Sequence, residues 1–174
     1  MADREVEVKF RCSNHSAVRE KLKSMGARLI AVVEQEDVYF QHPCKNFAET
    51  DETLRLRKYG KNIVLTYKGP KEGGWAKTRR EVEVKIDDYE KAYELITSLG
   101  FTPVAKIRKK REFYELMGVE VSLDTVEELG NFVEIEDKGG GLDTIRKLVD
   151  ELGLKEGPIY KSYLELYLEK VSRK

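Results

Sequence analysis

The sequence is poor in cysteine and has no long apolar run. Its 174 residues include only two cysteines, Cys12 and Cys44, which lack the spacing of a metal site or a redox motif. We therefore expect free thiols in a reducing compartment. The first eight residues, MADREVEV, are charged where a secretion signal is apolar, and no segment approaches the roughly 20 apolar residues that cross a bilayer. These absences predict a cytoplasmic protein without membrane contacts.

The sequence also has no excess of charge of either sign. Lys and Arg number 32, as do Asp and Glu, so the net charge of zero gives no reason to expect a nucleic-acid partner. Charged residues nevertheless make up 37% of the chain, against about 25% in typical soluble domains. Two interpretations are open: a heavily solvated surface, or an interior site that holds charges of both signs. Composition alone favours the first.

Periodicity divides the chain into short elements without a long linker. Alternation and extended character predict eight strands, within residues 4–11, 28–41, 51–59, 62–69, 78–86, 104–116, 119–124 and 131–137. Helical spacing that ends at a glycine predicts three helices, within residues 15–26, 87–100 and 142–153. Residues 69–80, GPKEGGWAKTRR, are interpreted as a mobile, solvated loop, with the alternative that Arg79 and Arg80 reach a bound nucleotide. The length fits one domain, residues 1–174.

The chain contains an internal repeat. EVEVKF at residues 5–10 recurs as EVEVKI at residues 81–86, and the pair Tyr39-Phe40 lies 74 residues before Phe113-Tyr114. Each half consists of a strand, a helix that ends in glycine, a long strand and a hairpin. This order indicates an ancient duplication.

Alternation places charged residues on one face of each strand. In the first strand, Glu5, Glu7 and Lys9 share a face opposite Val6, Val8 and Phe10. The hairpin of residues 53–68 presents basic residues and that of residues 119–136 presents acidic ones. An open sheet would leave these faces in water, whereas a curled sheet with helices outside would turn them inward.

The set of strands favours the curled sheet. Like charges two residues apart repel, so repeated E-x-E and R-x-R pairs need counter-charges nearby. Carboxylates two apart on a strand have Cα atoms roughly 7 Å apart, so both can converge on one hard cation. Arg and Lys on facing strands can hold phosphate oxygens. A divalent cation together with a polyphosphate is the ligand that satisfies both signs.

The ordered motifs resemble a known family. E-x-E-x-K, LRLRK, TYKGP, REVEVK, KKREFY, the lone Asp of VSLD, VEIE and KSYLEL follow one another along essentially the whole chain. This order resembles the CYTH superfamily of triphosphate tunnel enzymes, which includes class IV adenylate cyclases and thiamine triphosphatases. The segments QEDVYFQHP, TDETLRLR and LTYKGP are most similar to the class IV adenylate cyclase branch.

The resemblance implies a fold and a set of site residues. The fold is α+β, a closed antiparallel β-barrel of about eight strands with helices packed outside. The implied ligands of Mg²⁺ or Mn²⁺ are Glu5, Glu7, Asp124, Glu134 and Glu136. The implied triphosphate-binding residues are Lys9, Arg55, Arg57, Lys68, Arg111 and Lys161. Glu5, Glu7 and Lys9 are the expected catalytic residues. Glu81, Glu83, Lys85 and Lys109 are further candidates for the lumen, either as substrate contacts or as a salt-bridge network.

The motifs leave the reaction open. A cyclase would convert ATP to cyclic AMP and pyrophosphate, and the resemblance favours this activity. A triphosphatase would hydrolyse inorganic triphosphate, thiamine triphosphate or a nucleoside triphosphate in the same tunnel. A catalytically inactive protein would bind nucleotide or polyphosphate without turnover. No motif predicts an adenine pocket, and a homodimer is suggested by the resemblance alone.

Overall fold

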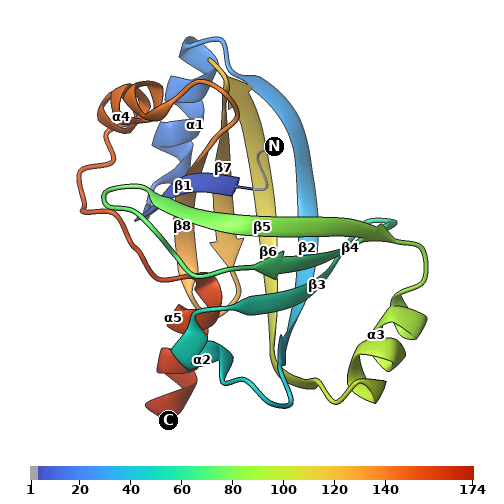
Figure 1. Cartoon of the computed structure of the whole chain (residues 1–174). Helices are drawn as coiled ribbons and strands as arrows, with labels where there is room; N and C mark the ends of the chain where they lie inside the picture. Colours follow the sequence, from blue (N-terminus) through green and yellow to red (C-terminus); the bar gives the residue numbers. More distant parts are fainter. Residues whose placement is uncertain (1–3) are drawn as a thin grey trace.

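The structure, a computed structural model, describes residues 4–174 and shows one closed barrel (Figure 1). The strands are β1 (Arg4–Arg11), β2 (Arg28–Gln41), β3 (Thr53–Tyr59), β4 (Asn62–Lys68), β5 (Lys77–Ile86), β6 (Thr102–Leu116), β7 (Val119–Val126) and β8 (Gly130–Asp137). The helices are α1 (His15–Ser24), α2 (Phe47–Thr50), α3 (Tyr89–Ser98), α4 (Leu142–Glu151) and α5 (Tyr163–Ser172). All neighbouring strands are antiparallel. The predicted α+β barrel with helices outside is confirmed.

The two halves of the sequence occupy equivalent places in the barrel. The strand order is β1-β5-β4-β3-β2-β6-β7-β8, so the first strands of the halves pair with each other and so do the long strands β2 and β6. Each half follows its first strand with a helix, a long strand and a hairpin. The internal repeat of the sequence is therefore also a repeat of structure.

Alternation along each strand separates the core from the lumen. In β1, Val8 and Phe10 are buried in an apolar cluster outside the barrel wall, whereas Glu7 and Lys9 face inward. Lys9 lies opposite Glu134 in the β1–β8 ladder. The same strands thus bury apolar side chains on one side and charged side chains on the other.

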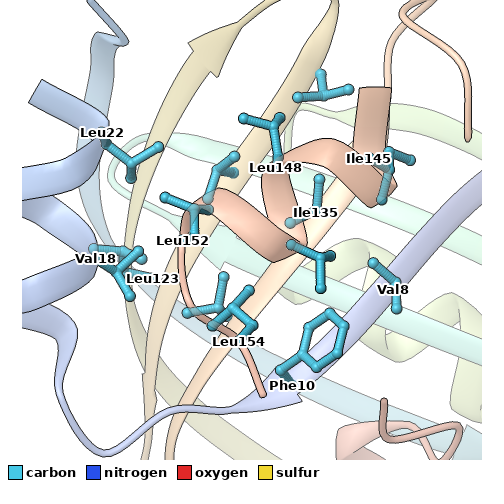
Figure 2. Packing of buried hydrophobic residues seen from close by; sticks show 14 of the residues in the cluster. Val8, Phe10, Val18, Leu22, Leu123, Ile135, Ile145, Leu148, Leu152 and Leu154 are labelled. Carbon is cyan, nitrogen blue, oxygen red and sulfur yellow. The ribbon is translucent and has the colours of Figure 1, made fainter. Parts of the chain in front are cut away.

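Helices α1 and α4 cover the apolar outer face of β1, β7 and β8. Figure 2 shows Leu22 of α1 and Leu148 of α4 among the strand residues Leu123 and Ile135. Leu22 and Leu148 are fully buried, and burying a leucine side chain contributes about 1.5–3 kcal/mol. Helix α3 similarly packs Ile96 against residues of β2 and β3. This outer packing holds the curled sheet closed.

Helix α5 lies at one end of the barrel. Its Tyr163 packs against Tyr39, Ile107, Val126 and Phe132, which project from the strands into that end. Ser162 caps the helix and forms a capping box with Glu165. This end of the lumen is therefore filled by apolar and aromatic side chains.

The sequence predicted three of the five helices that the structure has in residues 4–174. Helix α2 is a single turn, too short to give a periodic signal. Helix α5 was missed although S-x-x-E at residues 162–165 is a capping-box pattern.

No helix in the described part of the chain has both the length and the apolarity to cross a membrane. Both cysteines are free.

Candidate functional site

The lumen contains a cavity of about 370 Å³ whose wall is mainly charged. Its charged lining residues are Glu5, Glu7, Lys9, Arg55, Arg57, Lys68, Lys77, Arg79, Glu81, Glu83, Lys109, Arg111, Glu120, Glu134, Glu136 and Lys138. Charged residues of both signs line this cavity, as the interior-site interpretation of the composition requires.

Strands β1 and β8 form an acidic part of the wall. Glu7 lies opposite Glu136 in their ladder, and Glu5 and Glu134 project from the same faces. Lys77 pairs with Glu7 at 2.8 Å, and Lys68 pairs with Glu5 at 2.9 Å. These carboxylates are therefore partly neutralised from neighbouring strands.

Glu136 is the least compensated of these carboxylates. Burial, reinforced by the charges of Glu5 and Glu7, raises the pKa of Glu136 to about 7. Lys138 pairs with Glu136 at 2.9 Å and offsets only part of that effect. A hard divalent cation would relieve the repulsion among these three carboxylates.

The acidic side chains of the wall are spread out rather than gathered around one point. Within residues 4–174, no group of three carboxylate, histidine or cysteine side chains lies close enough to hold one ion. The oxygen donors on the wall have the chemistry that Mg²⁺ and Mn²⁺ prefer. Their nearest partners here are lysines and arginines, which a metal–phosphate complex would have to displace or share.

The hairpin β3–β4 supplies a basic part of the wall. Arg57 donates two hydrogen bonds to Asp37, at 2.7 and 2.8 Å. Arg55 is buried and its Nη2 lies 3.4 Å from the hydroxyl of Thr66, whereas its Nε has no hydrogen-bond partner among the residues that the structure describes. Lys68 reaches across to Glu5 and to Glu81. Arg55 is thus the member of this group with donor capacity to spare.

A network joins β6, β7, β8 and α5. Arg111 donates to both carboxylate oxygens of Asp124, at 2.7 and 2.6 Å, and to Glu134 at 3.0 Å. The hydroxyl of Tyr163 donates to Asp124 at 2.7 Å. Although burial opposes ionisation, the charge of Arg111 lowers the pKa of Asp124. Asp124 is fully buried behind Arg111, and its two oxygens are already engaged.

Lys109 is a buried cation without an ion pair in the described part of the chain. It is 5% exposed, lines the cavity, and holds its amine 4.8 Å from the centre of the Tyr163 ring. Burial, followed by the charges of Arg111 and Arg57, lowers the pKa of Lys109 well below its usual value. An anion bound in the cavity would stabilise the charged amine of Lys109 and so offset the effects of burial and of the neighbouring arginines.

Lys9 has a related but better-satisfied environment. Its amine donates to the carbonyl of Lys161 at 2.9 Å and lies 3.7 Å from Glu134 and 4.1 Å from the centre of the Tyr163 ring. Burial and the charge of Lys77 lower the pKa of Lys9 to about 8. Lys9 and Lys109 therefore bracket the aromatic side chain that fills the end of the lumen.

Most of the predicted site residues line one cavity, and three do not. Lys85 is exposed beyond the cavity wall, and Asp124 stands behind Arg111. Lys161 contributes its carbonyl to Lys9, but its half-exposed side chain pairs with Glu169 on α5. Whether the lining residues bind metal or phosphate remains a prediction.

Sequence reasoning missed several lining residues. Lys77 falls in the segment that was interpreted as a solvated loop, and Arg79 falls where that segment overlaps the predicted strand of residues 78–86; both lie on β5 and are buried. That interpretation was wrong for these residues, because β5 begins at Lys77 and pairs with β1. The alternation of Lys77, Arg79, Glu81 and Glu83 was the available signal. Gln35 and Tyr59 were missed because they carry no charge.

Comparisons with known proteins agree with this geometry. The sequence model of the CYTH domain matches residues 3–165. A protein from Methanocaldococcus jannaschii named "Putative adenylate cyclase MJ0240" is 42% identical over 170 residues, which cover 93% of this chain and 97% of that protein.

Solved structures show the same fold. The PH1819 protein of Pyrococcus horikoshii OT3 superposes with a TM-score of 0.84 at 41% identity and covers 95% of this chain and 99% of its own. A Hippeastrum protein described as "putative adenylyl cyclase HpAC1", with a dominant triphosphatase activity, has a TM-score of 0.74 at 19% identity. That alignment covers 95% of this chain and 96% of the Hippeastrum chain, and it shows a shared fold alone.

Proposed function

The chain belongs to the CYTH domain family, and from this premise we propose that it is a divalent-metal-dependent enzyme that converts ATP to cyclic AMP and pyrophosphate. The observation that carries triphosphate binding is the buried Lys109, which has no ion pair within residues 4–174 and lies near the charges of Arg111 and Arg57. Arg57 and Arg111 are paired with Asp37 and Asp124, whereas the buried amine of Lys109 has no such partner in the described residues, so a bound anion would stabilise its charged form. The cyclase assignment is supported by the name of the 42% identical relative.

The basic residues of the wall would hold the triphosphate. Arg55, Arg57, Arg111 and Lys109 present donors toward the cavity from β3 and β6, and Lys68 and Lys9 add amines from β4 and β1. Arginine binds phosphate oxygens through its fork and lysine binds them as a point charge. Together these groups orient the phosphate chain and stabilise charge that develops on the leaving phosphate.

The acidic residues would hold the metal. Glu5, Glu7 and Glu136 are the proposed ligands, with Glu134 beside them, and Asp124 acts through Arg111 rather than directly. A bound Mg²⁺ or Mn²⁺ would polarise the phosphoryl oxygens and offset the charge of the leaving group. The protein's own contribution is to carry these carboxylates on one wall of the cavity and to fill one end of the lumen with aromatic and apolar side chains.

In the proposed reaction, the ribose 3′-oxygen attacks the α-phosphorus. The bond between the α-phosphorus and the bridging oxygen to the β-phosphate breaks, pyrophosphate leaves, and the 3′-hydroxyl proton passes to solvent or to a basic group. Hydrolysis would instead place water at the terminal phosphorus and release orthophosphate. The position of the triphosphate relative to the metal decides between these outcomes.

Product analysis tests the proposal. The purified chain is incubated with ATP and Mg²⁺ or Mn²⁺, and cyclic AMP, pyrophosphate and orthophosphate are quantified. Equal amounts of cyclic AMP and pyrophosphate support the cyclase. Orthophosphate without cyclic AMP would replace it with a triphosphatase, and tight binding without turnover would make the protein a binder. Glu5→Gln and Glu136→Gln should each lower metal-dependent turnover at least tenfold, and unchanged turnover would overturn the metal-site assignment.

A further inference from the structure

The inner face of the β2–β3 ladder changes character along its length. Three cross-strand pairs follow one another: Tyr39 with Arg55, Asp37 with Arg57, and Gln35 with Tyr59. Tyr39 packs against Tyr163 at the end of the lumen that α5 fills. Tyr59 is the last residue of β3, so the Gln35–Tyr59 pair is the member of the series farthest from α5. The wall thus passes from charged to neutral polar.

Gln35 is a buried amide with an unused oxygen. It is 7% exposed and lines the cavity, and its Oε1 has no hydrogen-bond partner within the part of the chain that the structure describes. A buried acceptor without a partner costs about 1–3 kcal/mol. Native proteins rarely keep such a group unless a ligand or water satisfies it.

The neighbours of Gln35 identify the chemistry of the missing partner. Gln35 lies opposite Lys109 in the β2–β6 ladder and opposite Tyr59 in the β2–β3 ladder. A phosphate held by Lys109 therefore lies beside Gln35. Ionised phosphates offer acceptors only, so they cannot satisfy Oε1, whereas ribose hydroxyls and the amino groups of bases are donors.

Tyr59 completes a surface suited to a nucleoside. Its ring lines the same cavity, on the strand that carries Arg55 and Arg57. Aromatic side chains stack on bases irrespective of their sequence, and a carboxamide reads donors and acceptors on a base or sugar. An inorganic triphosphate offers neither a donor for the Gln35 oxygen nor a ring that can stack on Tyr59.

We propose that Gln35 and Tyr59 form the nucleoside subsite of the tunnel and that its substrate class is a nucleoside 5′-triphosphate rather than inorganic triphosphate. This inference rests on the proposed triphosphate site. It predicts that the two residues contribute to the affinity for ATP and leave the affinity for tripolyphosphate unchanged.

The test uses two probes that the protein cannot cleave. Wild type, Gln35→Leu and Tyr59→Leu are titrated by calorimetry, in Mg²⁺, with methylene-bridged analogues of ATP and of tripolyphosphate. We expect each variant to weaken binding of the ATP analogue about tenfold, the effect of one lost hydrogen bond or stacking contact. Binding of the tripolyphosphate analogue should change less than twofold.

A matched control comes from the other glutamine of β2. Gln41 donates to the carbonyls of His42 and Lys45, outside the cavity. Gln41→Leu should leave both affinities unchanged. Tyr59→Phe, which keeps the ring, should retain more affinity for the ATP analogue than Tyr59→Leu.

The outcomes separate this inference from the proposed function. Suppose that wild type binds both analogues. If Gln35→Leu then weakens the binding of both analogues equally, or of neither, the nucleoside subsite is wrong and the triphosphate site stands. If wild type binds the ATP analogue no more tightly than the tripolyphosphate analogue, the nucleoside preference is also overturned. If wild type binds neither analogue, both proposals fail.

Discussion

Asp37 and Arg57 form a bidentate ion pair across the β2–β3 ladder, with both nitrogen–oxygen distances below 3 Å. Asp37 is 1% exposed. Burial opposes ionisation, but the charge and hydrogen bonds of Arg57, and then the charges of Arg55 and Lys109, lower the pKa of Asp37. This carboxylate holds the side chain of Arg57 on the lumen wall, and its charge also acts on Arg55 and Lys109, so it couples the stability of the barrel to the shape of the site.

We predict that Asp37→Asn destabilises the protein by about 3 kcal/mol at pH 7, because it leaves a buried arginine without its counter-charge. The folded-state pKa is depressed, so the stabilisation is present above the unfolded-state pKa of about 4 and is lost as pH falls below it. The difference between wild type and variant should therefore shrink between pH 5 and pH 3. Urea unfolding at several pH values measures it.

The control for this prediction is Glu36→Gln. Glu36 is the neighbouring carboxylate, on the outer face of β2, where it pairs with Arg108 and Lys106 near solvent. Exposed pairs of this kind contribute about 0–1 kcal/mol. An equal loss of stability from both variants would contradict a special role of the inward pair.

Glu136 should destabilise the metal-free protein. Its folded-state pKa of about 7 lies above the unfolded value, so the folded state holds a proton more tightly and stability falls as pH rises from about 4 toward 7. We predict that Glu136→Gln raises the free energy of unfolding by about 1–2 kcal/mol at pH 8 in the presence of a chelator. The gain should fade toward pH 4.

A divalent metal should stabilise wild type more than it stabilises Glu136→Gln. Adding Mg²⁺ at pH 8 should raise the melting temperature of wild type more than that of Glu136→Gln, because the cation relieves the same repulsion. Glu127→Gln, at an exposed position in the β7–β8 turn, is the control and should respond to Mg²⁺ as wild type does. Equal Mg²⁺ responses of wild type and Glu136→Gln would argue against a metal at this carboxylate.

Gly140 packs its backbone against the β6–β7 turn. A Cβ at this position would overlap the carbonyl oxygen of Met117 and press on Gly118. We predict that Gly140→Ala destabilises the protein by about 2 kcal/mol, within the usual range for overpacking. Gly157→Ala, where no heavy atom of the described residues lies within 4 Å of the added Cβ, should change the stability by less than about 0.5 kcal/mol. Thermal unfolding of both variants measures the contrast.

The barrel was predictable because its pattern is local. Strict alternation located the strands, and like charges repeated on one face indicated an enclosed lumen. Helix α5 escaped prediction because its residues Tyr163, Leu164, Leu166, Tyr167 and Leu168 do not leave a clean polar face. Its capping box, Ser162 with Glu165, was the signal that could have located it.

The sequence predicted which charged residues line the lumen but not which residues they pair with. E-x-E-x-K placed Glu5, Glu7 and Lys9 on the wall, but the second copy of the motif leaves Lys85 exposed at the far end of β5. The pairing of Asp37 with Arg57 depends on strand register, which a single strand's pattern does not contain. Gln35 was not predicted because the role of an uncharged amide can be inferred only from its burial and its neighbours in the structure.

Binding of tripolyphosphate to Lys109→Met, compared with wild type and Lys85→Met, tests the central claim most directly. Lys109 is buried in the lumen without an ion pair in the described residues, whereas Lys85 is an exposed lysine of β5 outside the cavity wall. Calorimetry in Mg²⁺ with the methylene-bridged analogue should show at least tenfold weaker binding for Lys109→Met and no change for Lys85→Met. Equal affinity of Lys109→Met and wild type, with both proteins folded, would contradict a triphosphate site in the tunnel.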